Sequence, residues 1–419
     1  MTAEIAVMNT KAVALAADSA VTINYGEKVY HSVDKLFQLS CVHPVGVMFY
    51  GRDNFLNIPW ETIIKSYRQR LKDAHFPTVS AYARDFFQFL QQAEFDAASK
   101  NGREALFVLE AIQMELKAME KKLTDLKNRL FKKLGEFVPH DEKMKIYNEQ
   151  AEQYLLRCIR YLKKDYIHPF GDEDFATLMD TYSDFIEKKA RKLLTEKLMK
   201  EDWLELVKAI VLSFLLKDFS NYKSGIVFAG FGEQEYLPSV VAFEVDGKIN
   251  GKLKFRLVPE KTKKIDEQIN ASIIPFAQVD MVDAFITGID YQLENYYLSE
   301  IEKMLETIPK QMKQLVKTKW DAADLDALEA EMYVKLIQLY RDFNEKIQRF
   351  KEKRFIDPII YNVQVLPKKE LAEMAEALVQ LTSFKRKVTA AVESVGGPID
   401  VAVISKSDGF VWFKKKQTL

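Results

Sequence analysis

The stretch MTAEIAVMNTKAVALAADSAVT, residues 1–22, predicts two buried strands joined by a tight turn. Its two largely apolar runs, residues 5–9 and 12–18, are separated only by Thr10 and Lys11, and both have the length of strands. Thr2 leads into the first strand directly after the start methionine. Most chains begin instead with a polar tail that takes no part in the fold. The position of Thr2, at the very start of a predicted buried strand, therefore suggests that this residue has a chemical role.

Charge and cysteine usage exclude several classes of protein. The 419 residues include 61 Lys and Arg against 61 Asp and Glu, so we expect neither nucleic acid nor a membrane as partner. Cys41 and Cys158 lack the spacing of a zinc site or of a disulfide framework, which favours a cytoplasmic location. The most apolar helical stretch, residues 204–216, contains Lys208 and is too short to cross a bilayer. We expect no signal peptide before Thr2.

Strand-like and helix-like segments alternate along the chain. Short apolar runs predict strands, and apolar residues spaced three and four apart predict helices. Strands are predicted within residues 5–51, 224–279 and 399–416, and helices within residues 59–219, 281–354 and 368–395. The length allows two or three domains, or one core that carries large insertions.

Four stretches together resemble the proteasome-type N-terminal nucleophile hydrolases, the family of proteasome β subunits and bacterial relatives that include Anbu. They are TAEIAVMNTKAVALAADSAVT at 2–22, DKLFQLS at 34–40, GIVFAGFGEQEYLPSVVAFEVDG at 225–247 and GGPIDVAVISKSDGF at 396–410. They look like the family's threonine strand and turn, its lysine-bearing strand, the strand pair after its second helix, and its C-terminal hairpin. The resemblance implies an α+β fold of the four-layer αββα sandwich type.

The same resemblance divides the chain into a core and two insertions. It assigns residues 2–96, 196–294 and 368–419 to the hydrolase core. Residues 97–195 and 295–367 have no counterpart in the family, and their periodic apolar and charged residues predict two coiled-coil-like helical insertions.

A threonine hydroxyl needs a neighbouring base to act as a nucleophile. The α-amino group of the same residue, with an ordinary pKa of about 8, can be that base, provided that Met1 is removed and Thr2 becomes the first residue. The resemblance implies that Thr2 is the nucleophile, that Lys35 tunes the amine and that Asp18 holds Lys35. Lys35 lies one residue further from the threonine than is usual in the family. The resemblance also implies that the backbone of Thr22 binds an extended peptide by strand addition.

Several positions depart from the family pattern. Met48 stands where the family has a glycine, and we expect its backbone N–H to donate to the oxyanion. Gln278 stands where the family has a serine beside the nucleophile. The later serine and aspartate cluster is replaced by VESVGG, in which Glu393 and Ser394 lie one step from the matched positions. Gln278, Glu393 and Ser394 are therefore candidates for an auxiliary role only.

The resemblance implies hydrolysis of peptide or other amide bonds through an acyl-enzyme on Thr2, with no cofactor and no metal. It further implies a peptide or protein substrate and a homo-oligomer, either a ring or a helical stack; an unfoldase or adaptor partner is not identified. Two alternatives stay open. The protein could be a weakly active or inactive scaffold that works through its helical arms, or it could be an amidase acting on a small molecule.

The site residues also have simpler interpretations. Asp18 could be a turn residue, and Lys35 could be a surface lysine paired with Asp34. The segment FKKK, residues 413–416, is typical of a solvated chain end. The five histidines lack the spacing of a metal site.

Overall fold

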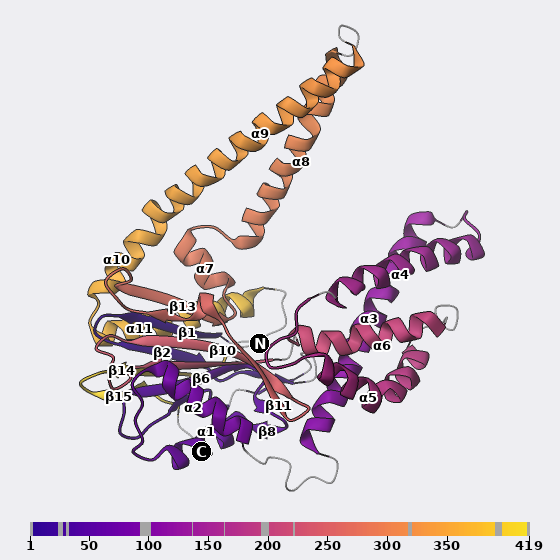
Figure 1. Cartoon of the computed structure of the whole chain (residues 1–419). Coiled ribbons are helices and arrows are strands. Elements are labelled where there is room, and N and C mark those ends of the chain that lie inside the picture. Colours follow the sequence, from indigo (N-terminus) through magenta and orange to yellow (C-terminus); the bar gives the residue numbers. More distant parts are fainter. Residues whose placement is uncertain are drawn as a thin grey trace.

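The chain folds as a mixed α+β protein in which two antiparallel sheets carry two helical arms (Figure 1). The α+β class predicted from the sequence is therefore confirmed. The structure is a computed structural model. It describes residues 3–23, 28–30, 33–92, 102–135, 137–162, 164–193, 201–220, 223–316, 321–389 and 396–416.

The first sheet contains the opening stretch of the chain. Its strands lie in the order β13 (Ala271–Ala277), β1 (Ala3–Asn9), β2 (Val13–Asp18), β14 (Ile399–Ser405) and β15 (Gly409–Lys414), each antiparallel to its neighbours. All residues of β1 and β2 are buried. Their apolar runs are nearly continuous because both faces of this sheet are covered. The pairing of β14 with β2 brings the C-terminal hairpin beside the opening stretch.

The second sheet is built mainly from the middle of the chain. Its strands lie in the order β11 (Lys252–Leu257), β10 (Ser239–Ile249), β9 (Ser224–Gly230), β6 (Val45–Gly51) and β5 (Leu36–Gln38), and β12 (Lys263–Lys264) also pairs with β10. Two small hairpins pair β3 (Val21–Ile23) with β4 (Lys28–Tyr30), and β7 (Asn54–Phe55) with β8 (Ile58–Pro59).

The two sheets pack face to face, and helices cover their outer faces. Alternate residues of β1 and β2 enter the cluster between the sheets, which includes Ala6, Met8, Val13, Leu15, Met48, Val227, Ala229 and Ala242. The residues between them face α11 (Lys368–Val388). Helices α1 (Trp60–Leu71) and α2 (Val79–Gln92) pack on the second sheet. At Gly46 the sheets come so close that a Cβ atom would lie 2.8 Å from Ile404.

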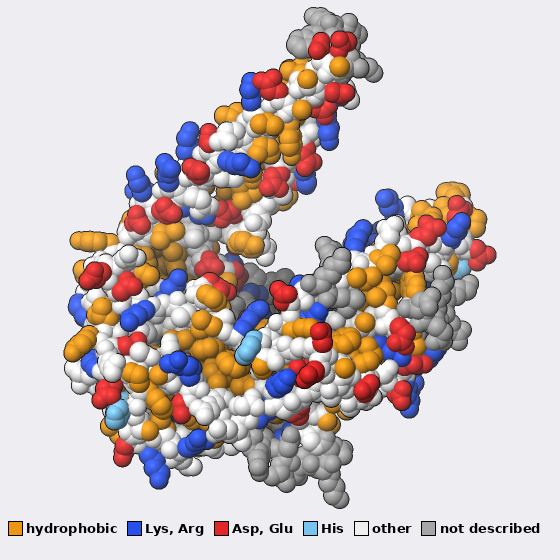
Figure 2. Space-filling view, viewed as in Figure 1, with side chains coloured by type: hydrophobic (Ala, Val, Ile, Leu, Met, Phe, Trp, Pro, Cys, Tyr) orange, Lys and Arg blue, Asp and Glu red, His pale blue; other side chains and the backbone are white. Residues whose placement is uncertain are grey.

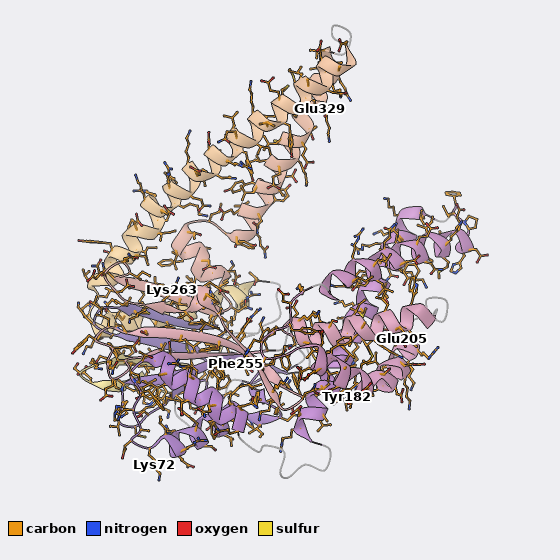
Figure 3. The ribbon with its side chains drawn as sticks, in the orientation of Figure 1. Lys72, Tyr182, Glu205, Phe255, Lys263 and Glu329 are labelled. Carbon is orange, nitrogen blue, oxygen red and sulfur yellow. The ribbon has the colours of Figure 1, made fainter. Side chains whose placement is uncertain are left out.

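The first arm consists of four helices, α3 (Arg103–Leu134), α4 (His140–Leu162), α5 (Asp172–Leu193) and α6 (Glu201–Lys217). Tyr182 and Glu205 mark α5 and α6 in Figure 3. Helix α3 contacts β10, while α6 packs against α4 and α5. Helix α6 therefore lies with the arm, although its residues fall in the predicted core segment 196–294.

The second arm is a hairpin of α8 (Tyr291–Val316) and α9 (Ala322–Lys351), and Glu329 marks its far end in Figure 3. Its base is formed by α7 (Asp280–Thr287), the π-helical turn Glu352–Ile356 and α10 (Asp357–Val365). A short 3₁₀ turn, Pro259–Lys261, links β11 to β12. Gly288 allows close packing at the base, because a Cβ atom there would lie 2.7 Å from the Phe355 ring.

Two sequence expectations are corrected by the structure. The helix expected over residues 368–395 ends at Val388, because Thr389 is extended, with φ −98° and ψ 156°. The FKKK segment is not simply a solvated end. The side chain of Lys416 is only 6% exposed, and its Nζ lies 2.9 Å from Asp34 and 2.6 Å from the carbonyl oxygen of Val33. Charge pattern alone could not reveal these partners, which lie far away in the sequence.

The apolar helix α6 is packed against its neighbours along much of its length. Its Lys208 is buried and forms ion pairs with Glu205 at 2.7 Å and Glu187 at 3.1 Å. Within the described ranges, no helix combines the length and the apolar character needed to span a membrane.

Candidate active site

Asp18 joins three segments that are far apart in the sequence. Its Oδ1 accepts a hydrogen bond from Lys35 Nζ at 2.6 Å and another from the backbone N–H of Ala3 at 3.2 Å. Its Oδ2 accepts from the backbone N–H of Gly396 at 2.9 Å. Asp18 is the last residue of β2 and is 2% exposed. Buried Asp18 therefore links Ala3, Lys35 and Gly396 through hydrogen bonds. Its interpretation as a mere turn residue is wrong.

Lys35 is also buried, with an exposed fraction of 1%. It lies just before β5, and its carbonyl oxygen accepts the N–H of Phe49 on β6 at 3.0 Å. The interpretation of Lys35 as a surface lysine paired with Asp34 is wrong, since Asp34 pairs with Lys416 instead. A buried ammonium requires anionic partners. Lys35 obtains one from the end of β2 and a second from β1.

The second anionic partner is Glu4, which the sequence analysis did not single out. Its Oε1 lies 3.5 Å from Lys35 Nζ, and both side chains are at most 1% exposed. Glu4 shares its strand face with Ala6 and Met8, which point between the sheets. The signal in the sequence was an acidic residue inside an otherwise apolar strand. One ammonium thus faces two carboxylates.

Tyr50 on β6 borders this cluster. Burial, together with the negative charges of Glu244 and Glu4, raises the pKa of its phenol well above the ordinary value. Its ring lies 5.6 Å from that of Phe276. Gly225 makes room for it, because a Cβ atom on Gly225 would lie 1.9 Å from the ring. Tyr50 therefore stays protonated at pH values at which an exposed tyrosine ionises.

Met48 is held in the middle of the second sheet. Its side chain is fully buried between the sheets, and the residue pairs with Leu36 of β5 and Val227 of β9. Backbone N–H groups point alternately to the two sides of a strand, and the N–H of Phe49 points to Lys35. The N–H of Met48 therefore points to β9, which argues against the expected oxyanion role.

Thr22 lies in β3, where it pairs with Val29 of β4. Gln278 follows β13 directly, and its side-chain oxygen accepts a hydrogen bond from Arg386 of α11. The preceding residue, Ala277, is paired with Ala3 and has a φ of 58°, a conformation that favours glycine. Gln278 therefore lies near the start of β1. It directly follows Ala277, whose positive φ is a conformation that glycine adopts more readily.

Three of the predicted site residues, Thr2, Glu393 and Ser394, lie outside the described residues. Their roles remain predictions. The first described residues after these positions, Ala3 and Gly396, both donate a backbone hydrogen bond to Asp18. Among the residues that the structure describes, no group of three or more His, Cys, Asp or Glu side chains is arranged to hold a metal ion.

No protein-family model matches the chain, and no curated protein matches it.

Proposed function

We propose that this protein is an N-terminal threonine hydrolase of the proteasome type, which cleaves peptide or other amide bonds. One observation carries the proposal. Segments 2–22, 34–40 and 396–410 resemble the family at separate places in the sequence, and residues from all three meet at Asp18. The order of layers, helix, sheet, sheet and helix, supports the same αββα sandwich.

In the proposed reaction, the hydroxyl oxygen of Thr2 attacks the amide carbonyl, and its proton passes to the free α-amine of Thr2. The amine returns this proton to the leaving nitrogen, which leaves an ester on Thr2. Water then attacks the ester with the amine again as base. Lys35 supplies a fixed positive charge, and Asp18 holds it in position through a 2.6 Å bond. Covalent labelling of Thr2 by an electrophile tests the proposal directly.

Glu4 changes the electrostatics of this mechanism. With Asp18 and Glu4 around one ammonium, the charged groups sum to one net negative charge. That charge stabilises the ammonium that forms when the Thr2 amine takes up a proton. It therefore offsets the lowering of the amine pKa by Lys35.

The Glu4→Gln variant is expected to lower the pKa of the Thr2 amine by about one unit, as for the loss of one nearby opposite charge. Because only the neutral amine acts as base, labelling of Thr2 rises with pH through this pKa. The midpoint of the rise should therefore move to lower pH. The measurement is the rate of labelling between pH 5 and pH 9, and Glu61→Gln, at an exposed carboxylate, is the control. An unchanged midpoint, or one moved to higher pH, would contradict this role.

A second observation favours self-association as part of the function. The α8–α9 hairpin exposes a stripe of apolar side chains between charged ones (Figure 2). On α8, Met304, Ile308, Met312 and Leu315 recur at spacings of four, four and three, so they share one helix face.

A helix with the length of α8 is roughly 39 Å long. Two such helices side by side offer roughly 800 Å², the area that each partner gives to a standard interface. We propose that a second copy of the chain covers this arm.

Shortening the hairpin is expected to lower the oligomeric mass. Replacing residues 301–341 with a short Gly-Ser linker removes the apolar stripe but keeps the base, where Lys351 pairs with Glu294 at 2.7 Å. Labelling of Thr2 should be unaffected, since the arm contributes nothing to the Asp18 cluster. Sedimentation velocity of both proteins is the measurement. If the shortened protein had the same association state as the full chain, another surface would hold the copies together.

A further inference from the structure

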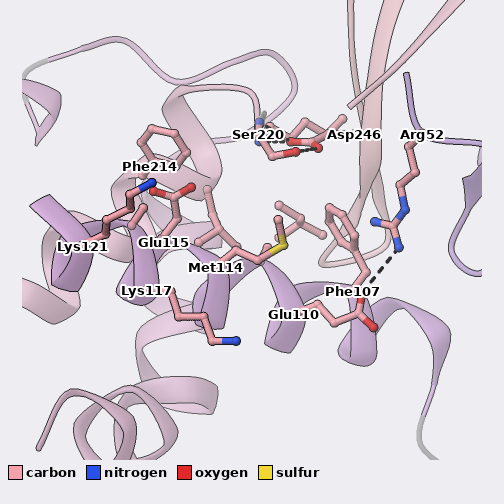
Figure 4. Close-up of a pocket in the computed structure, with 15 residues that line it drawn as sticks. Arg52, Phe107, Glu110, Met114, Glu115, Lys117, Lys121, Phe214, Ser220 and Asp246 are labelled. Atoms are coloured by element: carbon pink, nitrogen blue, oxygen red, sulfur yellow. Dashed lines mark hydrogen bonds and ion pairs between the residues drawn. The ribbon is translucent and has the colours of Figure 1, made fainter. Parts of the chain in front are cut away.

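A cavity of about 520 Å³ lies at the base of the first arm, and none of its lining residues belongs to the Asp18 cluster (Figure 4). Its walls come from α3, α6, β10 and β11, with Arg52 on one side. Seven of its fifteen lining residues are apolar: Phe107, Ala111, Met114, Ala118, Phe214, Leu215 and Ile249. Both the volume and the lining fit a binding site for a small organic molecule.

The strongest polar groups of this cavity are already paired. Asp246 accepts hydrogen bonds from Lys254 Nζ at 2.8 Å and from Ser220 Oγ at 2.5 Å. Arg52 bonds Asn54 at 3.0 Å and lies 3.4 Å from Glu110 (Figure 4). Binding of a ligand therefore need not compete for these groups.

Glu115 of α3 is the exception. No hydrogen bond or ion pair is made to its carboxylate by the residues that the structure describes. Burial raises the pKa of Glu115 to about 7. Lys254 on β11 and Lys122 on α3 favour its charged form, whereas Asp246 on β10 and Asp218 after α6 oppose it.

Glu115 also borders a second cavity of about 320 Å³, across which lie Tyr154 and Arg157 of α4. Glu115 therefore lies between two cavities of mixed lining, and its carboxylate makes no direct ion pair with the described residues.

We propose that the larger cavity binds a small organic amine with an apolar body, whose ammonium group pairs with Glu115. The apolar walls would bury the body, and the ammonium would provide the charge partner that Glu115 lacks. An organic anion fits less well, because Glu115 and Asp246 would repel it, while Lys254 and Arg52 already have acidic partners. Lys117 and Lys121 also line the cavity, but both are exposed, so water and salt screen their charges.

The test is isothermal titration of the full chain with 2-phenylethylamine, using 2-phenylethanol and 3-phenylpropanoate as neutral and anionic probes of similar shape. The amine should bind most tightly. Glu115→Gln should weaken its binding at least about tenfold, as expected for the loss of a charge-assisted hydrogen bond. Glu120→Gln, on the same helix but outside the lining of both cavities, should change it less than about threefold.

The pH dependence provides a second readout. Because the carboxyl pKa is about 7 and only its charged form pairs with the ammonium, binding of the amine should tighten about tenfold from pH 6 to pH 8. In Glu115→Gln this change should disappear. Equal binding of the amine and the alcohol, tighter binding of the anion, or no binding of the amine would each overturn the proposal. None of these outcomes depends on activity at Thr2.

Discussion

Thr2→Ala is expected to abolish covalent labelling of the protein by a peptide epoxyketone or β-lactone. The β-lactone acylates the Thr2 hydroxyl, and the epoxyketone bonds both the hydroxyl oxygen and the α-amine of an N-terminal threonine. The rest of the chain contains no second residue that combines these two groups. Loss of one methyl and one hydroxyl next to the first described residue should have little effect on folding.

Intact-mass spectrometry is the measurement. In protein from its native host, the wild-type mass should lack Met1 and should increase by one reagent on labelling. Thr10→Ala is the matched control, because Thr10 is exposed and lies just beyond β1. It should label at the wild-type rate. Labelling that persisted in Thr2→Ala would show that the nucleophile assignment is wrong, and retention of Met1 would leave only the scaffold function.

Lys35→Met is expected to lower the free energy of unfolding by about 3–5 kcal/mol, the usual cost of removing one partner of a buried ion pair. Methionine fills a similar volume but leaves Asp18 and Glu4 facing each other without a cation. Both carboxylates are nearly inaccessible to water, so solvent cannot replace the lost ammonium. This effect does not depend on whether the protein is an enzyme.

Urea unfolding is the measurement, with Lys65→Met as the control. Lys65 is paired with Glu61 on the surface of α1, and its loss should change stability by less than about 1 kcal/mol. Adding Asp18→Asn to Lys35→Met removes one of the two stranded carboxylates and should recover part of the loss. If Lys35→Met were as stable as the control, the buried charge cluster would not exist in solution.

The same site gives a functional comparison. In Asp18→Asn, Lys35 keeps Glu4 as an anionic partner at 3.5 Å, so this variant should fold and lose less labelling activity than Lys35→Met. We expect the loss in Lys35→Met to be roughly 10²- to 10⁴-fold, the scale of one preorganised charged group. Equal labelling rates in Lys35→Met and the wild type would contradict the proposed role of Lys35, even if the variant were destabilised.

The sequence was sufficient for the mixed α+β class and for most elements, because their signals are local. The apolar runs in residues 5–9 and 12–18 became β1 and β2, and the strands predicted within residues 399–416 became β14 and β15. The periodic charged segments became the helices of the two arms. Each of these strands and helices is specified by residues that are close neighbours in the sequence.

The partners of buried charges were decided by the tertiary structure alone. Lys416 pairs with Asp34, and Lys35 has Glu4 as a second partner, although nothing near these residues in the sequence indicates either contact. The resemblance matched Asp18 with Lys35, but it could not place Glu4 beside them or turn the N–H of Met48 towards β9. Pairing across sheets depends on register and on how the layers stack. Register and stacking arise from contacts between residues that are far apart in the sequence, such as Asp18 and Gly396.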